Sequence, residues 1–305
     1  MSDVVCLGIL VADVIARPVD GLPPGGELEL VDEISMRGGG CALNTASVLV
    51  RFGVTASVVG KVGLDPFGDF VVRLLEERAI EHSGVARDPA TSTSASVVLV
   101  DSAGERTFLH LPGANGRLRV DELDEESLFS ARVLHVAGAL VMPDLDGRPT
   151  AALLERAKAR GLTTSLDTVW DATGRWERLV PSLPHLDLFV PSLSEAVAVS
   201  GEQEPAAVAA WLREQGVGTV ALKLGADGCY VSGAEFEGLV DAPEIAAVDG
   251  TGAGDAFAAG FLYGYLAGWP LERSAALANA AGALATTAVG AVEGVGSLEE
   301  ALALT

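Results

Sequence analysis

Sulfur, aromatic side chains and positive charge are all scarce in this sequence. Its 305 residues include three cysteines, Cys6, Cys41 and Cys229, and their wide spacing argues against a disulfide framework or a cysteine-based metal cluster. We therefore expect reduced thiols in a cytoplasmic protein. Lys and Arg number 20 against 42 Asp and Glu, which gives a formal net charge of −22. Nucleic acid and anionic membranes repel such a charge, so neither is expected as a partner.

The sequence also lacks a long run of strongly hydrophobic residues. Its first apolar run is interrupted at Asp13, which is typical of a strand rather than of a signal peptide. The longest apolar stretch, residues 274–292, consists mostly of Ala, Gly and Thr and contains Asn279. Because Ala contributes little to membrane insertion, this stretch predicts a helix packed tightly against a sheet.

Short β-branched runs alternate with amphipathic helical segments along most of the chain. The expected strands are residues 4–11, 56–63, 132–140, 163–169, 185–191 and 218–225. The expected helices are residues 44–51, 67–77, 150–160, 195–200 and 205–215. Such alternation predicts that helices cover both faces of a mostly parallel sheet, in one large domain or in two units.

Two segments break this rhythm because no helix separates their strands. Residues 27–36 and 92–112 show the period-two alternation of strands, and the second segment has a hairpin pattern at residues 101–105. We expect these strands to form a small antiparallel sheet beside the main one.

Three glycines alternate in the stretch DGTGAGDAFAAGF, residues 249–261, directly before an apolar helix. Glycine is unfavourable inside a helix, so the helix is expected to begin after them. The amides of Gly252, Ala253 and Gly254 would then form a cradle for phosphate oxygens. Asp255 cannot bind phosphate, but it could accept the proton of a hydroxyl that attacks phosphorus. A plain capping turn with Asp255 as the cap is the alternative.

Other nucleotide-binding motifs are missing from the sequence. Gly60-Lys61 has Thr55 where a P-loop carries its leading glycine. No G-x-G-x-x-G motif follows a strand with an acidic residue placed for a ribose. The motifs of protein kinases are absent as well.

A second glycine cluster, RGGGCALN, occupies residues 37–44. Gly39 and Gly40 would let a ligand approach the backbone, and Asn44 offers a donor and an acceptor to a polyol. A flexible turn followed by a helix cap is the alternative.

Together these motifs resemble the ribokinase family of small-molecule kinases, also called the PfkB carbohydrate kinases. The family motif D-T-x-G-A-G-D matches residues 249–255, and G-G-x-x-x-N matches residues 39–44. VGKVGLDPFGD at residues 59–69, PGAN at 112–115 and LKLGADG at 222–228 lie between them in the family's order. The resemblance thus extends over nearly the whole chain.

The resemblance implies one ribokinase-like kinase domain, residues 1–305. Its fold would have three α/β/α layers around a mostly parallel central sheet and a small antiparallel β lid. It also implies transfer of the γ-phosphoryl group of ATP to a hydroxyl of a small sugar, with Mg²⁺ neutralising charge. Asp255 matches the general base of the family. The amides of Gly252, Ala253 and Gly254 match the groups that stabilise the transferred phosphoryl group.

Other residues match binding positions of the family. The resemblance assigns to the sugar side Asp13, Gly39, Gly40 and Asn44. It assigns to the nucleotide side Lys223, Gly225, Gly228 and Asn279. Taken alone, Asp13 also fits a turn at a strand end, and Lys223 also fits an ordinary surface charge.

The cation-binding positions depart in part from the family pattern. Where the family usually has P-N-x-x-E, residues 191–195 read PSLSE, so Ser192 replaces the asparagine. Glu195 matches an outer-shell ligand of Mg²⁺, although it also fits a helix-start acid. Asp249 and Thr251 match positions near a monovalent-cation site in some relatives. A dependence on K⁺ is therefore a hypothesis.

The family's lid often pairs with a second subunit. We accordingly expect a lid within residues 12–37 and 92–112, and a homodimer formed through it. The acceptor remains open: a sugar such as ribose or fructose, or a sugar acid, leads because Asp13 and Asn44 suit vicinal hydroxyls. A nucleoside is the nearest rival, and a sugar phosphate is third. A non-catalytic regulator that binds a sugar or a nucleotide is the alternative from another class, but it would not need a base at Asp255.

Overall fold

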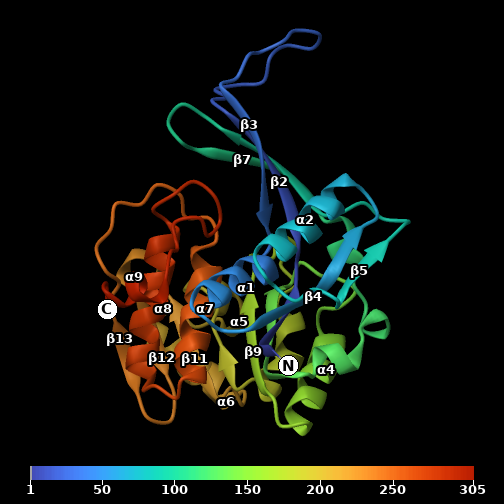
Figure 1. The fold of residues 1–305 in the computed structure, drawn as a ribbon. Coiled ribbons are helices and arrows are strands. Elements are labelled where there is room, and N and C mark those ends of the chain that lie inside the picture. Colours follow the sequence, from blue (N-terminus) through green and yellow to red (C-terminus); the bar gives the residue numbers. More distant parts are fainter. Residues whose placement is uncertain (1) are drawn as a thin grey trace.

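A nine-stranded sheet forms the centre of the protein (Figure 1). The computed structural model describes residues 2–305. From one edge to the other the sheet contains β13 (Glu237–Val240), β12 (Cys229–Ser232), β11 (Thr219–Lys223), β10 (Leu188–Phe189), β9 (Thr163–Thr168), β8 (Ala131–Ala139), β1 (Ser2–Gly8), β4 (Ala56–Gly63) and β5 (Val85–Asp88). Every pairing from β11 to β5 is parallel, and the antiparallel pairings are those of β12 with β11 and with β13. The expected mostly parallel sheet is confirmed.

Helices cover both faces of this sheet, as the alternation of strands and helices predicts. Along β1, Val4 and Cys6 pack into one hydrophobic core, while Val5 and Leu7 pack into another on the opposite face. The first core contains side chains of α1 (Cys41–Arg51), α2 (Pro66–Glu77), α7 (Ala253–Leu266), α8 (Leu271–Ala285) and α9 (Leu298–Leu302). The second contains side chains of α3 (Glu125–Leu128), α4 (Arg148–Ala159), α5 (Leu193–Ser200) and α6 (Pro205–Glu214). The three-layer architecture is confirmed.

Of the Ala-rich stretch expected to form a packed helix, residues 274–285 lie in α8, whereas residues 286–292 form turns and bends. Most apolar residues of α8 are fully buried, and its small side chains let it pack closely along α7. At Gly260 of α7, for example, a Cβ atom would lie 2.8 Å from the Cα atom of Ala278. Within residues 2–305, no helix combines the length and the apolar character that crossing a membrane requires.

A second sheet of four strands projects from one end of the body (Figure 1). Its order is β3 (Glu33–Gly39), β2 (Val11–Arg17), β6 (Ala95–Val100) and β7 (Arg106–Leu111). The predicted hairpin joins β6 to β7, and its turn is closed by the amide of Asp101, which donates to the carbonyl of Glu105 at 3.0 Å.

The structure corrects two details of this small sheet. β2 and β6 pair in parallel, because each is the first strand of a hairpin that leaves the body and returns to it. Residues 27–32 are not in a strand, although their pattern alternates. The β2–β3 ladder ends at Arg17 and Glu33, so residues 18–32 form the loop beyond the last paired residues.

Candidate active site

A cavity of about 810 Å³ lies where the carboxyl ends of β9 and β11 meet the start of α7. Parallel α/β sheets commonly bind ligands at this end of their strands. Residues predicted from the sequence for different roles converge on its wall: Glu195, Lys223, Gly225, Gly228, Gly252, Ala253, Gly254, Asp255 and Asn279. The fold therefore joins motifs that lie far apart in the chain.

Gly252 and Gly254, at the start of α7, have little room for a side chain. Gly252 has a φ of 74°, and a Cβ atom there would lie 2.0 Å from the carbonyl oxygen of Ala291. A Cβ atom at Gly254 would lie 3.1 Å from the ammonium nitrogen of Lys223. Side-chain-free backbone thus brings the first amides of α7 to the cavity, as anion binding at a helix start requires.

Asp255 does not cap α7. Gly252 occupies the N-cap position, and no side chain there accepts a capping bond. The carboxylate of Asp255 is buried and accepts a hydrogen bond of 2.7 Å from the Nδ2 atom of Asn44 in α1. Burial raises the pKa of Asp255 above its usual value, and the bond from Asn44 opposes that rise. This environment suits a general base rather than a helix cap.

Asn44 has one polar atom that the protein leaves without a partner. Its Oδ1 atom is buried and accepts no hydrogen bond within the described chain. A buried amide oxygen without a partner is costly, and a hydroxyl group of a ligand would satisfy it. The observation fits the substrate-side position that the sequence predicts for Asn44.

Lys223 is not a surface charge. Its ammonium donates to both carboxylate oxygens of Asp167 at the end of β9, at 2.7 and 2.9 Å. Burial raises the pKa of Asp167 to about 7, although Lys223 acts against that rise. Sequence reasoning missed Asp167. The signal was its place at the end of a predicted parallel strand, at the same sheet edge as Lys223.

Glu195 both caps its own helix and lines the cavity. Its carboxylate accepts from the amide of Ser192 at 2.9 Å and from the hydroxyl of Thr168 at 2.8 Å. Ser192 in turn caps α5 by accepting from the amide of Glu195. The serine that replaces the family's asparagine thus keeps the glutamate in place by a capping box.

The residues predicted for the nucleotide side help to shape the wall of the cavity. The amide group of Asn279 donates to the carbonyl oxygens of Val240 at 2.8 Å and Asp241 at 3.1 Å. Gly225 and Gly228 have φ values of 68° and 89°, which favour glycine. The two hydrogen bonds from Asn279 hold the loop that follows β13 beside the cavity.

Asp249 and Thr251 are bound to a cation of the protein itself. The guanidinium of Arg106, on β7 of the small sheet, donates to the side chains of both residues. Asp249 is almost fully buried and also accepts from the amides of Thr251 at 2.9 Å and Gly290 at 2.8 Å. Arg106 therefore connects the small sheet to the loop that precedes α7.

The remaining sugar-side residues lie at the base of the small sheet, outside the lining of the large cavity. A Cβ atom at Gly39 would lie 2.2 Å from a carboxylate oxygen of Asp13, and one at Gly40 would lie 2.4 Å from a backbone carbonyl. Burial raises the pKa of Asp13, and a hydrogen bond from Ser96 opposes it. Ser96 and its neighbour His110, 3.1 Å away, escaped sequence reasoning because ordinary strand residues surround them.

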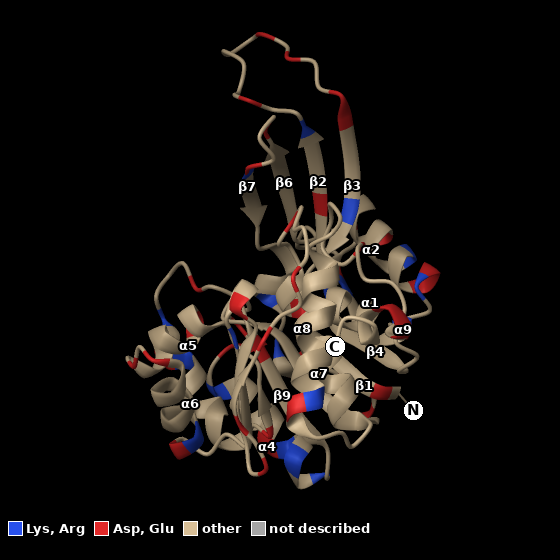
Figure 2. Cartoon of the chain, turned by 90° about the vertical axis from the view of Figure 1, so that its left-hand side faces the viewer, with Lys and Arg blue, Asp and Glu red and all other residues tan. Residues whose placement is uncertain are grey.

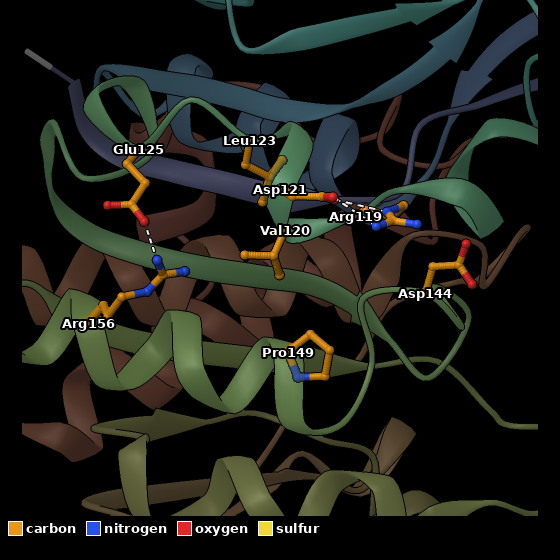
Figure 3. Close-up of a pocket in the computed structure, with 8 residues that line it drawn as sticks. All are labelled: Arg119, Val120, Asp121, Leu123, Glu125, Asp144, Pro149 and Arg156. Carbon is orange, nitrogen blue, oxygen red and sulfur yellow. Dashed lines mark hydrogen bonds and ion pairs between the residues drawn. The ribbon is translucent and has the colours of Figure 1, made fainter.

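A second, open cavity of about 650 Å³ lies elsewhere (Figure 3). Leu123 and Pro149 supply part of its wall, and ion pairs join Arg119 to Asp121 and Arg156 to Glu125. None of the residues predicted for catalysis or binding lines it. Four of its five charged side chains are paired with one another, so the large cavity is the better candidate for the active site.

The model of the pfkB family of carbohydrate kinases matches residues 1–297. The chain belongs to this family. Two relatives illustrate the similarity. A fructokinase of Klebsiella pneumoniae is 33% identical over 294 residues, which cover 92% of this chain and 94% of the relative. An uncharacterized sugar kinase of Archaeoglobus fulgidus is 30% identical over 81% of this chain and 97% of its own.

The fold of this carbohydrate kinase is that of ribokinases. A structure of Ribokinase II from Escherichia coli in complex with ATP and Mg²⁺ superimposes with a TM-score of 0.86. The match covers 100% of this chain and 99% of the other, at 25% identity. The ribokinase-like fold expected from the sequence is confirmed.

Proposed function

We propose that this carbohydrate kinase transfers the γ-phosphoryl group of ATP to a hydroxyl of a small sugar, in the class of ribose, fructose and sugar acids. One observation carries the proposal: a buried carboxylate, Asp255, lies beside side-chain-free amides at the start of α7 in a cavity of about 810 Å³. The pairing of a base with an anion-binding backbone is the arrangement that phosphoryl transfer to an alcohol requires.

In this proposal, each part of the site has one task. Asp255 takes the proton of the acceptor hydroxyl, and the bond from Asn44 keeps its carboxylate oriented. The amides of Gly252, Ala253 and Gly254 stabilise the charge that develops on the transferred phosphoryl group. Because Asp255 is buried, the proton is taken without competition from bulk water.

The carboxylates of the cavity fit a magnesium ion that arrives with the nucleotide. Mg²⁺ prefers oxygen ligands and commonly combines one or two carboxylates with substrate phosphates. Within residues 2–305, no three His, Cys, Asp or Glu side chains form a metal site by themselves. Glu195 lines this cavity and would hold the ion through water. When bound, Mg²⁺ would neutralise charge on the phosphates.

The polar groups around Asp255 support a polyol as the acceptor. The free Oδ1 atom of Asn44 and the carboxylate of Asp13 are both acceptors for hydroxyl groups. The Klebsiella relative is a fructokinase, which agrees with this class. A nucleoside is the second candidate acceptor, and a sugar phosphate is the third.

A screen of ADP release would test the proposal. The purified protein, with ATP and Mg²⁺, would be assayed with pentoses, hexoses, sugar acids, nucleosides and sugar phosphates. We expect acceptor-dependent ADP release with one sugar or sugar acid. Release with nucleosides alone would replace the sugar by the rival acceptor. Tight binding of a sugar without any ADP release would favour a non-catalytic regulator instead.

We also propose that the small sheet closes over the bound sugar as a lid. Arg106 of β7 already reaches the loop before α7, where it bonds Asp249 and Thr251. The same face of the sheet carries Asp13 and Ser96, which are paired residues of β2 and β6. Closure would place these polar groups around the acceptor and exclude water from the reaction.

The hypothesis of a monovalent cation at Asp249 and Thr251 leads to a prediction. If K⁺ binds there, replacing it with tetramethylammonium should lower kcat. Arg106 competes for the same oxygens, so Arg106→Gln should enlarge the K⁺ effect several-fold. Initial rates in the two salts, measured for both proteins, would test this. Equal rates in both salts for both proteins would exclude the cation site.

We further propose a homodimer formed through the lid. Met36, Val14, Val97 and Leu109 lie in one row across the four strands, on the face opposite Asp13. Along the projecting strands few residues carry charge (Figure 2). Exposed apolar side chains extend the row: Ile34, Met36, Val97, Leu109 and Leu111. An apolar face of this kind is typical of an interface between subunits.

Sedimentation of the protein would test the dimer. We expect a dimer at micromolar concentration and a monomer for Leu109→Glu, because a buried unpaired charge opposes association. Leu239→Glu is the matched control, since Leu239 is equally exposed, at 63% against 62%, but lies on β13 of the main sheet. A monomeric wild-type protein would contradict the proposal.

A further inference from the structure

The ion pair of Lys223 and Asp167 is nearly buried, yet it lies at the wall of the large cavity. Its two residues stand at the carboxyl ends of β11 and β9, which flank the short strand β10. Both carboxylate oxygens of Asp167 accept from the ammonium, at 2.7 and 2.9 Å. The side chains are only 14% and 4% exposed, yet both line the large cavity.

Among the described residues that line that cavity, Lys223 is also the one cation. Among the cavity-lining residues that the structure describes, the acidic side chains are Asp167, Glu195, Glu244 and Asp255. A triphosphate entering this cavity meets an excess of negative charge, and the low local dielectric strengthens the repulsion. Burial by itself lowers the pKa of Lys223, but the neighbouring carboxylates raise it above its usual value, so the ammonium stays charged.

The ammonium lies against the amides expected to hold the phosphoryl group. Its nitrogen is 3.1 Å from the position that a Cβ atom of Gly254 would occupy. An ammonium has three N–H donors, and Asp167 takes two of the directions around it. The third donor remains for a group in the cavity beside Gly254.

We propose that Lys223 is a catalytic residue that contacts the transferred phosphoryl group beside the amides of α7, and that Asp167 is the positioning residue that holds its ammonium there. The proposal rests on the proposed phosphotransferase function. A cation fixed beside the γ-phosphoryl group stabilises the charge that is spread over its oxygens in the transition state, so Lys223 acts mainly on kcat. Asp167 acts through Lys223 by fixing where the ammonium stands.

Steady-state kinetics with the sugar found in the ADP-release screen would test this proposal. Lys223→Met should lower kcat by about 100-fold or more, while KM for ATP changes only a few-fold. Lys223→Arg should restore part of kcat because it keeps the charge. Asp167→Asn should lower kcat less than Lys223→Met does, and Asp167→Glu should recover part of that loss.

Two further variants separate catalysis from folding. Removing one partner of a buried ion pair leaves an unpaired charge that can unfold a protein, whereas removing both avoids that cost. The double variant Lys223→Met, Asp167→Asn should therefore fold but stay as slow as Lys223→Met. Lys61→Met is the matched control, because Lys61 is 7% exposed and paired with Asp88 and Glu122 away from the cavity. Its kcat should equal that of the wild type.

The outcomes distinguish the proposed role of Lys223 from the proposed phosphotransferase function on which it rests. A wild-type protein that releases no ADP with any acceptor would overturn the proposed function. An active wild type together with a folded double variant whose kcat is within threefold of normal would overturn only the role of Lys223. Equal losses in Lys61→Met and Lys223→Met would likewise reduce the pair to a structural one.

Discussion

Asp255→Asn should lower kcat by about 10²–10⁴-fold, the range over which general bases contribute. Asparagine has nearly the same shape and can still accept the hydrogen bond from Asn44, but it cannot take a proton. Binding of ATP should change little, since the carboxylate is not a phosphate ligand. Initial rates of ADP release and nucleotide titration of the same preparation would measure both effects. A variant with unimpaired kcat would remove Asp255 from the mechanism.

The pH dependence of kcat/KM in the wild type should also show that Asp255 acts as the base. Asp255 works only when ionised, and burial raises its pKa above the ordinary value of an aspartate. As the pH falls through this raised pKa, the base becomes protonated and kcat/KM declines. The acidic limb should therefore lie at higher pH than it would for an exposed aspartate. It should be absent from the residual activity of Asp255→Asn.

Unfolding should not cause the low activity of Asp255→Asn, because the substitution should not destabilise the protein. A carboxyl whose pKa is raised by folding favours the neutral form in the folded state. The wild type consequently loses some stability as the pH rises through the folded pKa of Asp255. Asparagine is neutral throughout, so at neutral pH the variant should melt no lower than the wild type. A marked drop in Tm would point to a structural role instead.

Gly252→Ala should abolish most activity by a different route. The substitution puts a Cβ atom 2.0 Å from the carbonyl oxygen of Ala291, at a residue whose φ is 74°. The left-handed conformation alone costs an L-residue about 1–2 kcal/mol. The clash with backbone must in addition displace the first turn of α7 or the segment around Ala291. Moving one anion-stabilising amide costs about 10²–10³-fold in kcat.

Gly250→Ala is the matched control for this prediction. Gly250 also lines the cavity, two residues earlier in the same loop, but a Cβ atom there meets nothing within 4 Å. Its kcat should stay within a few-fold of the wild type. Thermal melts of both variants, with kcat and KM for ATP, would complete the comparison. Similar kinetics for the two alanine variants would show that the geometry of Gly252 does not matter for transfer.

Much of the architecture could be predicted from the sequence because its signals are local. Strand and helix periodicity repeats every few residues, so the strand at residues 56–63 was predicted with its exact bounds. The hairpin at residues 101–105 likewise depends on neighbours in the chain. The details of the small sheet depend on pairing between distant strands. For that reason the parallel β2–β6 pairing and the loop at residues 18–32 were not predicted.

In the candidate site, too, the local motifs were predictable and the long-range contacts were not. Glycine spacing and the adjacent Asp255 were readable as a phosphate cradle beside a base, because both features lie within a few residues. The choice between cap and base required Asn44, which contacts Asp255 across 211 positions of the chain. The contacts of Asp167 with Lys223 and of Arg106 with Asp249 were not predicted, because they join residues 56 and 143 positions apart.

By itself, the sequence determined the layered α/β class, the family and the residues at the start of α7, since each is encoded by short-range pattern and residue type. Only the tertiary structure decided which charges meet in the cavity and which residue of the small sheet reaches the loop before α7. The reason is physical: a buried ion pair depends on the order and register of strands. Those arise when the whole sheet assembles, and no local segment contains them.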